Sequence, residues 1–328
     1  MVKIRYYWID WMKLIGMLLI IWGHLFPKYS SDIIYSFNVP LFFCISGFLG
    51  GGKNRTLKLK PLVVPYLVVC ATYLLLDIPW QYKAGDLSCL NYIKSVGYML
   101  AGFQTTPHGV SASAMWFVYT LALCKAVHYI SGKTIYRLFI LVLFLVFTVV
   151  TQEYHLFWSF QNLFICYPFY YIGALLFEHC QSQIQMIKAF AQTKKFLCIC
   201  LVCTMVLLLS LIAPYNGFVK MYQCGYGHSF LLFFILSAIG VGAVFLFAMV
   251  LESIRPSFLR IISQGSIVIL AYHYLGIRCF NSVCKVMNED MMHSDWLTFC
   301  FSLSLLIVHI PIIKFVSRNI PIIVTIQR

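Results

Sequence analysis

The stretch DWMKLIGMLLIIWGH, residues 10–24, decides how the chain is interpreted. It is an apolar run with an acid and a cation near one end and a histidine at the other. At about 100° per residue, the eleven steps from Lys13 to His24 return to within roughly 20° of the start. Asp10, Lys13 and His24 therefore fall on one stripe of a helix, with His24 roughly 16 Å along the axis from Lys13.

Ionisable side chains inside an apolar helix are costly in lipid, so this stripe is expected to face a bundle interior or a wet cavity. His24 has two interpretations. It is either a histidine near a helix end, hydrogen-bonded to a neighbour or to interfacial water, or a catalytic base, because imidazole titrates near neutrality. Asp10 either orients Lys13 or forms an interfacial ion pair of little energetic weight.

The composition predicts an all-α polytopic membrane protein. The chain has 328 residues, 61% hydrophobic and 10% charged, with a mean hydropathy of +0.85. Soluble domains are about 45–50% apolar and about 25% charged. We therefore expect one integral-membrane domain over residues 1–328, with about ten transmembrane helices in a single bundle.

Ten segments are apolar and about long enough to cross a hydrocarbon core of about 30 Å. They are residues 11–27, 33–49, 61–79, 114–130, 135–150, 156–177, 196–213, 229–251, 261–280 and 296–316.

An even number of spans puts both termini on one side of the membrane. Seventeen Lys and Arg residues lie on the side of the N-terminus, six lie on the other, and Lys125 falls inside a span. The positive-inside rule then predicts cytoplasmic termini in the inner (cytoplasmic) membrane, with His24 towards the outer face. This topology also accounts for the net charge of +14, so no nucleic-acid partner is inferred.

A basic segment, KNRTLKLKPLVVPY at residues 53–66, follows the second span. Arg55, Lys58 and Lys60 lie at its start, at the predicted cytoplasmic mouth. Such cations bind anionic lipid, or they hold the phosphates of a soluble cofactor, Arg as a planar fork and Lys as a point charge. Both interpretations are open on these residues alone.

The segment just before it, FNVPLFFCISGFLGG at residues 37–51, contains one proline and several glycines. Ser46 with Gly47 is a candidate source of exposed amides that donate to a developing oxyanion. Thirteen cysteines are present. They lie mostly within apolar runs, where cysteine acts as a small hydrophobe, and no metal site is expected.

The ordered series of motifs resembles the acyltransferase 3 family of integral-membrane O-acyltransferases, and most closely its fucose 4-O-acetylase-like branch. The resemblance covers nearly the whole chain. The matching pieces are IDWMKLIGMLLIIWGH, FNVPLFFCISGF, the basic stretch that ends in VVPY, AMWFVYTLAL, YPFYYIGALL and SIVILAYHYL.

This resemblance implies an acyl donor, usually acetyl-CoA, that enters from the cytoplasm. It also implies an acceptor hydroxyl, usually on a cell-envelope glycan or lipid-linked sugar. It assigns the catalytic histidine to His24 and its basic partner to Lys13. The family's paired basic motif falls on Arg55 and Lys58, with lysine in the position usually held by a second arginine.

Two further residues enter through the same motifs. The family's late histidine falls on His273, although the proline that often follows it is a tyrosine here. Trp116, in the piece AMWFVYTLAL, is interpreted first as a packing residue and second as a binding residue. Whether His24 carries the acyl group or acts only as a base is open, as are the acceptor sugar, the acyl group and the formation of a homo-oligomer.

The main competing function is a transporter or flippase for an amphipathic solute. Such proteins are typically built from two matching halves with paired helices broken by Gly or Pro, and the sequence has no such internal repeat. A membrane scaffold is the second competitor. It would not need a lysine and a histidine on one buried stripe, so the sequence favours an enzyme.

Overall fold

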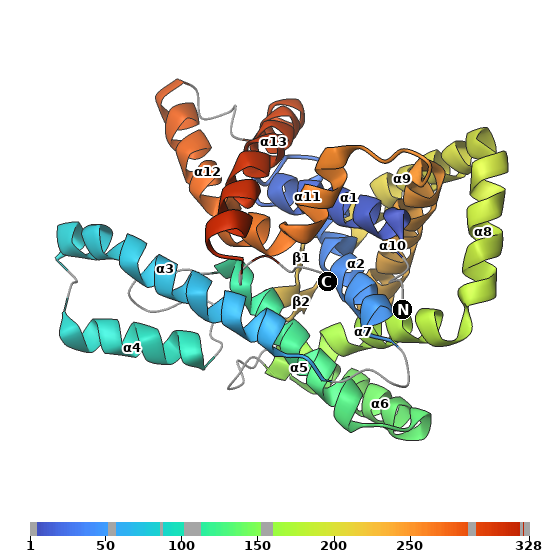
Figure 1. The fold of residues 1–328 in the computed structure, drawn as a ribbon, viewed down its shortest axis with the longest axis horizontal. Helices are drawn as coiled ribbons and strands as arrows, with labels where there is room; N and C mark the ends of the chain where they lie inside the picture. Colours follow the sequence, from blue (N-terminus) through green and yellow to red (C-terminus); the bar gives the residue numbers. More distant parts are fainter. Residues whose placement is uncertain are drawn as a thin grey trace.

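A computed structural model of the chain describes residues 5–51, 57–85, 88–101, 113–151, 160–287, 293–321 and 324. Within these ranges the side chains at 77, 80, 81, 83 and 84 are left out of the description. The described part is a bundle of helices with one short β-hairpin near its middle (Figure 1).

The helices are α1 (Tyr7–Gly23), α2 (Ser31–Gly50), α3 (Lys60–Ala84), α4 (Cys89–Leu100), α5 (Trp116–Ile130), α6 (Thr134–Val150), α7 (Phe160–His179), α8 (Gln181–Thr193), α9 (Lys195–Asn216), α10 (Phe230–Leu251), α11 (Ser257–Gln264), α12 (Ser266–Met287) and α13 (Asp295–Asn319). Two 3-10 turns, η1 (Ser113–Met115) and η3 (Met221–Gln223), and two antiparallel strands, β1 (Val219–Lys220) and β2 (Gly225–Tyr226), complete the described elements.

Each of the ten predicted spans overlaps at least one described helix, and the ninth overlaps two. Six of these helices, α2, α7, α9, α10, α12 and α13, are long and apolar enough to cross a membrane. Apolar helices of 10–17 residues occur in α3, α5 and α6. The all-α, membrane-type fold is therefore confirmed, and the number of ten crossings remains a prediction.

The ninth predicted span, residues 261–280, is not one helix. α11 ends at Gln264, Gly265 caps it, and α12 begins at Ser266. A side chain at 265 would meet Ile313 of α13, since a Cβ built there lies 2.4 Å from that residue. The helix therefore breaks where glycine permits a close approach of α13.

The centre of the bundle is the pair α2 and α7. Two thirds of the spanning window of each is buried (67%), compared with 17% for α9 and 22% for α13. Gly47 on α2 contacts the backbone of Tyr170, and Gly173 on α7 contacts that of Cys44. Small residues at such a crossing let two helix backbones approach closely, which explains why this pair forms the core.

Pro40 lies inside α2 without ending it. Proline has no N–H, so the carbonyl of Ser36, four residues earlier, loses its intrahelical donor. The Ser237 hydroxyl on α10 donates to that carbonyl at 2.7 Å. The proline therefore frees a polar group that joins α2 to α10.

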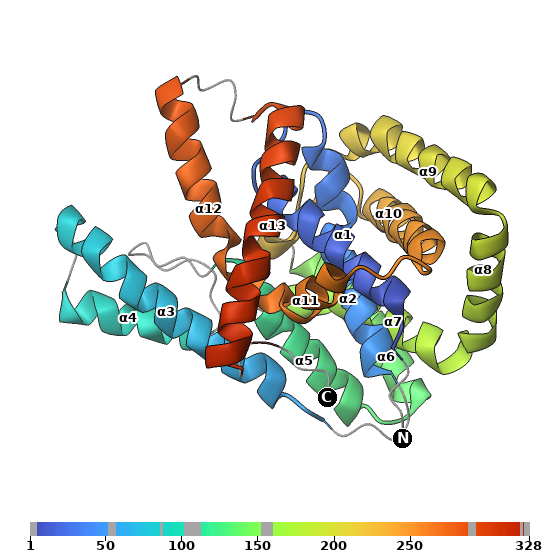
Figure 2. The same cartoon turned by 45° about the horizontal axis from the view of Figure 1, so that its top comes forward.

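α1 packs against α2, α10, α11, α12 and α13, and it runs through the interior of the bundle in Figure 2. Its apolar contact face includes Trp8, Met12, Met17 and Ile21, all buried. Near its other end, the Trp22 indole N–H donates to the Thr298 hydroxyl of α13 at 3.1 Å. These contacts hold the last turn of α1, where His24 follows directly as the capping residue.

Candidate active site

His24 lies against a second histidine, His273, from the middle of α12. The two rings have centroids 4.9 Å apart, and Nε2 of His273 lies 3.1 Å from Nδ1 of His24. His24 is half-buried, whereas His273 has no exposed surface. The structure thus brings together two site residues that are 249 positions apart in the sequence.

The neighbouring carbonyls determine where the hydrogens of this pair lie. Nδ1 of His273 is 3.0 Å from the carbonyl oxygens of Ile269 and Leu270. A carbonyl oxygen only accepts, so Nδ1 carries the hydrogen, and Nε2 of the neutral ring carries the lone pair. That lone pair accepts from Nδ1–H of His24, which is also 2.8 Å from the carbonyl of Ile20.

This tautomer leaves the lone pair of His24 on Nε2, an atom with no hydrogen bond to the described part of the chain. It is the atom that can remove a proton from a hydroxyl group. The tautomer is inferred from hydrogen-bond partners, as is usual for histidine.

Two tyrosines border the histidine pair. The ring of Tyr274 lies 4.7 Å from that of His24 and 4.6 Å from that of His273, and the ring of Tyr35 on α2 lies 6.1 Å from that of His24. α12 is held in place by Tyr73 of α3, whose hydroxyl donates to the Ala271 carbonyl at 2.5 Å. The His24 ring is therefore in contact with aromatic rings of both α2 and α12.

The charged residues near the start of α1 pair differently from the expectation. Asp10 accepts from Arg5, with Oδ2 2.7 Å from Nη2 and 2.8 Å from Nε, and from the hydroxyl of Ser263 on α11. Among the described residues, no carboxylate lies within 4.0 Å of the Lys13 ammonium. The Arg5 guanidinium presents two donors in one plane to the carboxylate, so Asp10 orients Arg5 and Ser263 rather than Lys13.

Lys13 itself is half-buried and lies on α1 between Asp10 and His24. Among the described residues its ammonium forms no ion pair, although it lies near enough to Asp10 to interact with that charge. The structure therefore leaves Lys13 suited to a binding role, without a contact that assigns one.

Ser46 and Gly47 do not supply exposed amides. Both lie inside α2, where each N–H is directed to the carbonyl four residues earlier. Gly47 also faces the backbone of Tyr170 on α7. The expectation that Ser46 and Gly47 offer exposed amides is therefore wrong, because α2 continues through both residues.

The basic segment is described only in part. Arg55 lies outside the described residues, whereas Lys58 and Lys60 are exposed, Lys60 at the first position of α3. The Lys125 ammonium on α5 donates to the Lys58 carbonyl at 3.0 Å, which fixes this segment to α5. Trp116, at the start of α5, is half-buried and its ring makes an edge contact with Phe117, as a packing residue does.

His309 on α13 is a further buried ionisable residue that belongs to none of the predicted motifs. Its side chain is buried, Nδ1 donates to the Leu305 carbonyl at 2.7 Å, and Nε2 has no partner among the described residues. The available signal was an ionisable residue within an apolar span, which marks a functional candidate in a membrane protein.

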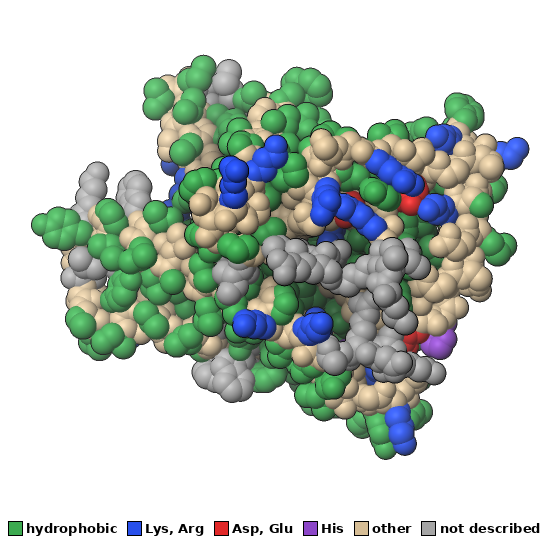
Figure 3. Space-filling model, viewed as in Figure 1, with side chains coloured by type: hydrophobic (Ala, Val, Ile, Leu, Met, Phe, Trp, Pro, Cys, Tyr) green, Lys and Arg blue, Asp and Glu red, His purple; other side chains and the backbone are tan. Residues whose placement is uncertain are grey.

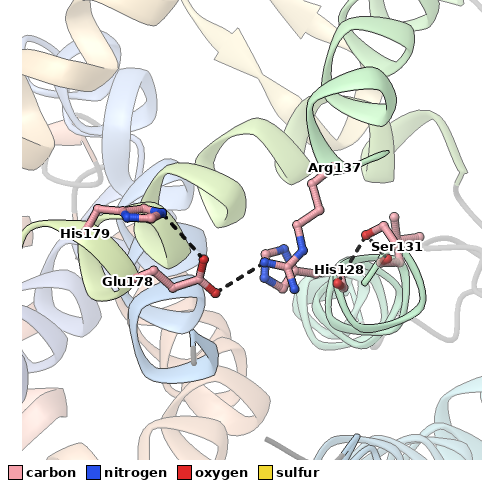
Figure 4. Close-up of polar contacts among 6 residues, drawn as sticks. His128, Ser131, Arg137, Glu178 and His179 are labelled. Carbon is pink, nitrogen blue, oxygen red and sulfur yellow. Dashed lines mark hydrogen bonds and ion pairs between the residues drawn. The ribbon is translucent and has the colours of Figure 1, made fainter. Parts of the chain in front are cut away.

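A second polar cluster was also missed, where α5, α6 and α7 meet. Arg137 pairs with Glu178 at 3.3 Å, and both side chains are largely buried. Figure 4 shows this pair with His128 of α5 alongside and His179 at the edge. Neither ring nitrogen of His128 has a partner in the described part of the chain. Arg137 and Glu178 are 41 positions apart in the sequence. No local sequence pattern therefore indicates that they pair.

The described residues form a bundle of membrane-type helices in which two histidines from distant segments lie in contact. The chain belongs to the acyltransferase 3 family, whose model, described as an acyltransferase domain, matches residues 6–318. This membership indicates a membrane acyltransferase. No curated protein and no solved structure gives a significant match to the chain.

Proposed function

We propose that this protein transfers an acetyl group from cytoplasmic acetyl-CoA to a hydroxyl of a cell-envelope glycan or its lipid-linked precursor, as in the fucose 4-O-acetylase-like branch. The observation that carries the proposal is the His24–His273 pair, because its hydrogen bonds leave Nε2 of His24 free to accept a proton.

In the proposed step, Nε2 of His24 takes the proton of the acceptor hydroxyl as the oxygen attacks the thioester carbon. A C–O bond forms, the C–S bond breaks, and the proton passes from His24 to the departing thiolate of coenzyme A. No other reactant is needed. General-base catalysis of this kind contributes typically about 10²- to 10⁴-fold in rate.

His273 acts through His24. When His24 becomes an imidazolium, its Nδ1–H donates to Nε2 of His273 and to the Ile20 carbonyl. Hydrogen bonds from a charged donor are stronger than those from a neutral one. The pair therefore stabilises the protonated intermediate state and fixes the orientation of the ring.

The donor would enter at the opposite end of α1. His24 is fourteen residues beyond Asp10, about 21 Å along the helix at about 1.5 Å per residue, a span suited to a thioester on a long flexible arm. Lys58, Lys60 and Arg55 are the proposed phosphate contacts. Lys and Arg side chains are spread over the face shown in Figure 3, around α11 and the start of α1, which supports a cytoplasmic orientation of that face.

The test is transfer by purified, membrane-reconstituted His24→Gln protein. Glutamine keeps size and polarity but does not accept a proton at neutral pH, so we expect transfer to fall at least about 10²-fold with acetyl-CoA binding retained. The matched control is His179→Gln, because the His179 side chain is 61% exposed at the end of α7. Parent-like turnover of His24→Gln would remove His24 from the mechanism.

Two mass measurements complete the test. Envelope glycans from cells with and without the protein should differ by whole acetyl groups. The protein mixed with acetyl-CoA but no acceptor should remain unmodified if His24 is only a base, and should gain one acetyl group if His24 carries it. Glycans with no mass difference would contradict the proposed acceptor class.

A further inference from the structure

A pocket of about 960 Å³ opens next to the end of α1, two residues beyond His24. It is lined from three segments: the connection between α1 and α2, the residues at β1, and the residues just before α13. The lining residues that carry the argument are Phe26, Lys28, Ser31, Phe218, Lys220 and His293.

Aromatic rings connect this pocket to the histidine pair. Phe26 stacks on Tyr35 with centroids 6.0 Å apart, and Tyr35 lies 4.4 Å from Phe218. Tyr35 in turn contacts His24. Phe218 is tilted by 52° to Tyr35 and by 42° to Phe26. The rings of Phe26 and Phe218 therefore give the pocket an angled apolar surface, which suits the C–H face of a sugar ring close to the histidine pair.

The charge of the pocket has one sign. Lys28 and Lys220 are exposed, and their ammonium groups lie 5.3 Å and 5.8 Å from the ring centres of Tyr29 and Phe218. No lining residue is acidic, and among the described residues neither lysine has a carboxylate within 4.0 Å. Both charges are therefore available to an anionic ligand.

The first segment is fixed to the start of α13. The Lys28 N–H donates to the His293 carbonyl at 3.0 Å, and His293 Nδ1 donates to the Phe26 carbonyl at 3.1 Å. The nearby Asp295 accepts from the Tyr29 N–H and the Ser30 hydroxyl, and among the described residues it makes no ion pair with Lys28.

The hairpin segment is fixed by Asn216, which is fully buried. Its amide donates to the Tyr226 carbonyl at 3.0 Å and accepts from the Ser229 N–H at 2.9 Å. Gly217, with φ +73°, permits the turn that leads into β1. Lys220 is thus held on a preformed support, which lowers the entropic cost of binding.

We infer that this pocket binds the acceptor through a phosphate group of a lipid-linked sugar. Lysine recognises phosphate as a point charge, whereas carboxylate recognition favours the planar fork of arginine, and no arginine lines the pocket. The pocket also lies where α1 ends and α2 and α13 begin, and the ends of membrane-spanning helices are expected at the level of the lipid headgroups. The inference rests on the proposed function for the identity of the bound molecule as acceptor.

The test compares two acceptors with the full-length protein in nanodiscs: a polyprenyl diphosphate-linked monosaccharide, and the same sugar on a polyprenyl ether without phosphate. The variant is the double substitution Lys28→Gln and Lys220→Gln. We expect the KM for the phosphorylated acceptor to rise about tenfold or more, with kcat and the KM for acetyl-CoA unchanged. The KM for the neutral acceptor should not change. Lys285→Gln is the control, since Lys285 is exposed at the end of α12 but does not line the pocket.

Direct binding separates this inference from the proposed function. His24→Gln protein should bind the phosphorylated acceptor as the parent does, and the double lysine variant should not, whether or not any transfer occurs. Equal binding by the double variant would overturn the inference. So would equally strong competition by a soluble uronate-containing glycan that carries no phosphate, because the pocket would then select carboxylate.

Discussion

Gly47→Ala is expected to destabilise the bundle strongly. A Cβ built at position 47 lies 1.9 Å from the carbonyl oxygen of Tyr170 and 3.1 Å from the backbone nitrogen of Ala174. Ordinary contacts between heavy atoms lie at about 3.5 Å, so α2 and α7 would have to separate by roughly 1.5 Å. The atoms that the added Cβ meets all belong to the backbone of α7, so no change of side-chain rotamer relieves the clash.

The loss of folding stability arises because this separation weakens the other contacts between α2 and α7. Extra volume in a packed core costs about 1–3 kcal/mol, occasionally more, and a gap of about 0.5–1 Å forfeits a quarter to a half of each dispersion contact. The crossing at Gly173, where a Cβ would lie 2.0 Å from the Cys44 carbonyl, would open with it. We therefore expect a loss of about 3 kcal/mol or more.

The assay is thermal unfolding of the detergent-solubilised protein, with a decrease in Tm of at least about 5 °C. The matched control is Gly97→Ala in α4, where a Cβ meets nothing within 4 Å. That change should be neutral, or should stabilise by up to about 1 kcal/mol through helix propensity. A Gly47→Ala protein with the Tm and yield of the parent would refute the close approach of α2 to α7.

Two further predictions concern partners of buried groups. His273→Phe should lower kcat about 10- to 100-fold, as loss of an orienting partner does, and should change the pH profile without changing either KM. His273→Gln should recover part of the rate, because the glutamine carbonyl can accept from His24. Unchanged kcat for His273→Phe would exclude the positioning role. Lys188→Ala should cost about 1–3 kcal/mol, because Glu252, the capping residue of α10, loses its partner; its side chain is 5% exposed and lies 2.6 Å from the Lys188 ammonium. The double change Lys188→Met and Glu252→Gln should recover most of that loss in an unfolding assay, and failure to recover would point to packing rather than charge.

The amino-acid sequence determined the elements that depend on local pattern. Apolar runs long enough to cross a membrane predicted helices at all ten segments, because a chain in lipid must satisfy its backbone hydrogen bonds within each helix. The motif series identified the family, and the stripe on α1 singled out His24. These features are encoded within segments of about twenty residues, so they can be inferred without knowledge of packing.

The tertiary structure decided which of these residues meet. Pro40 lies inside α2, which continues past it, and the Ser237 hydroxyl of α10 donates to the Ser36 carbonyl that proline leaves without an intrahelical donor. Asp10 accepts from Arg5, which is close to it in sequence, and from Ser263 of α11, rather than from its expected partner Lys13. Such outcomes depend on distances between distant segments, which periodicity does not contain.

The same reason applies to the site. The sequence alone indicated that His24 lies at the end of one apolar segment and His273 within another, and its motifs resemble those of an acyltransferase family. Only the packing of α1 against α12 brought their rings to hydrogen-bonding distance, and only the carbonyls facing each ring set which nitrogen is free. The position of a proton on an imidazole depends on partners within about 3 Å, and those partners are chosen by the fold.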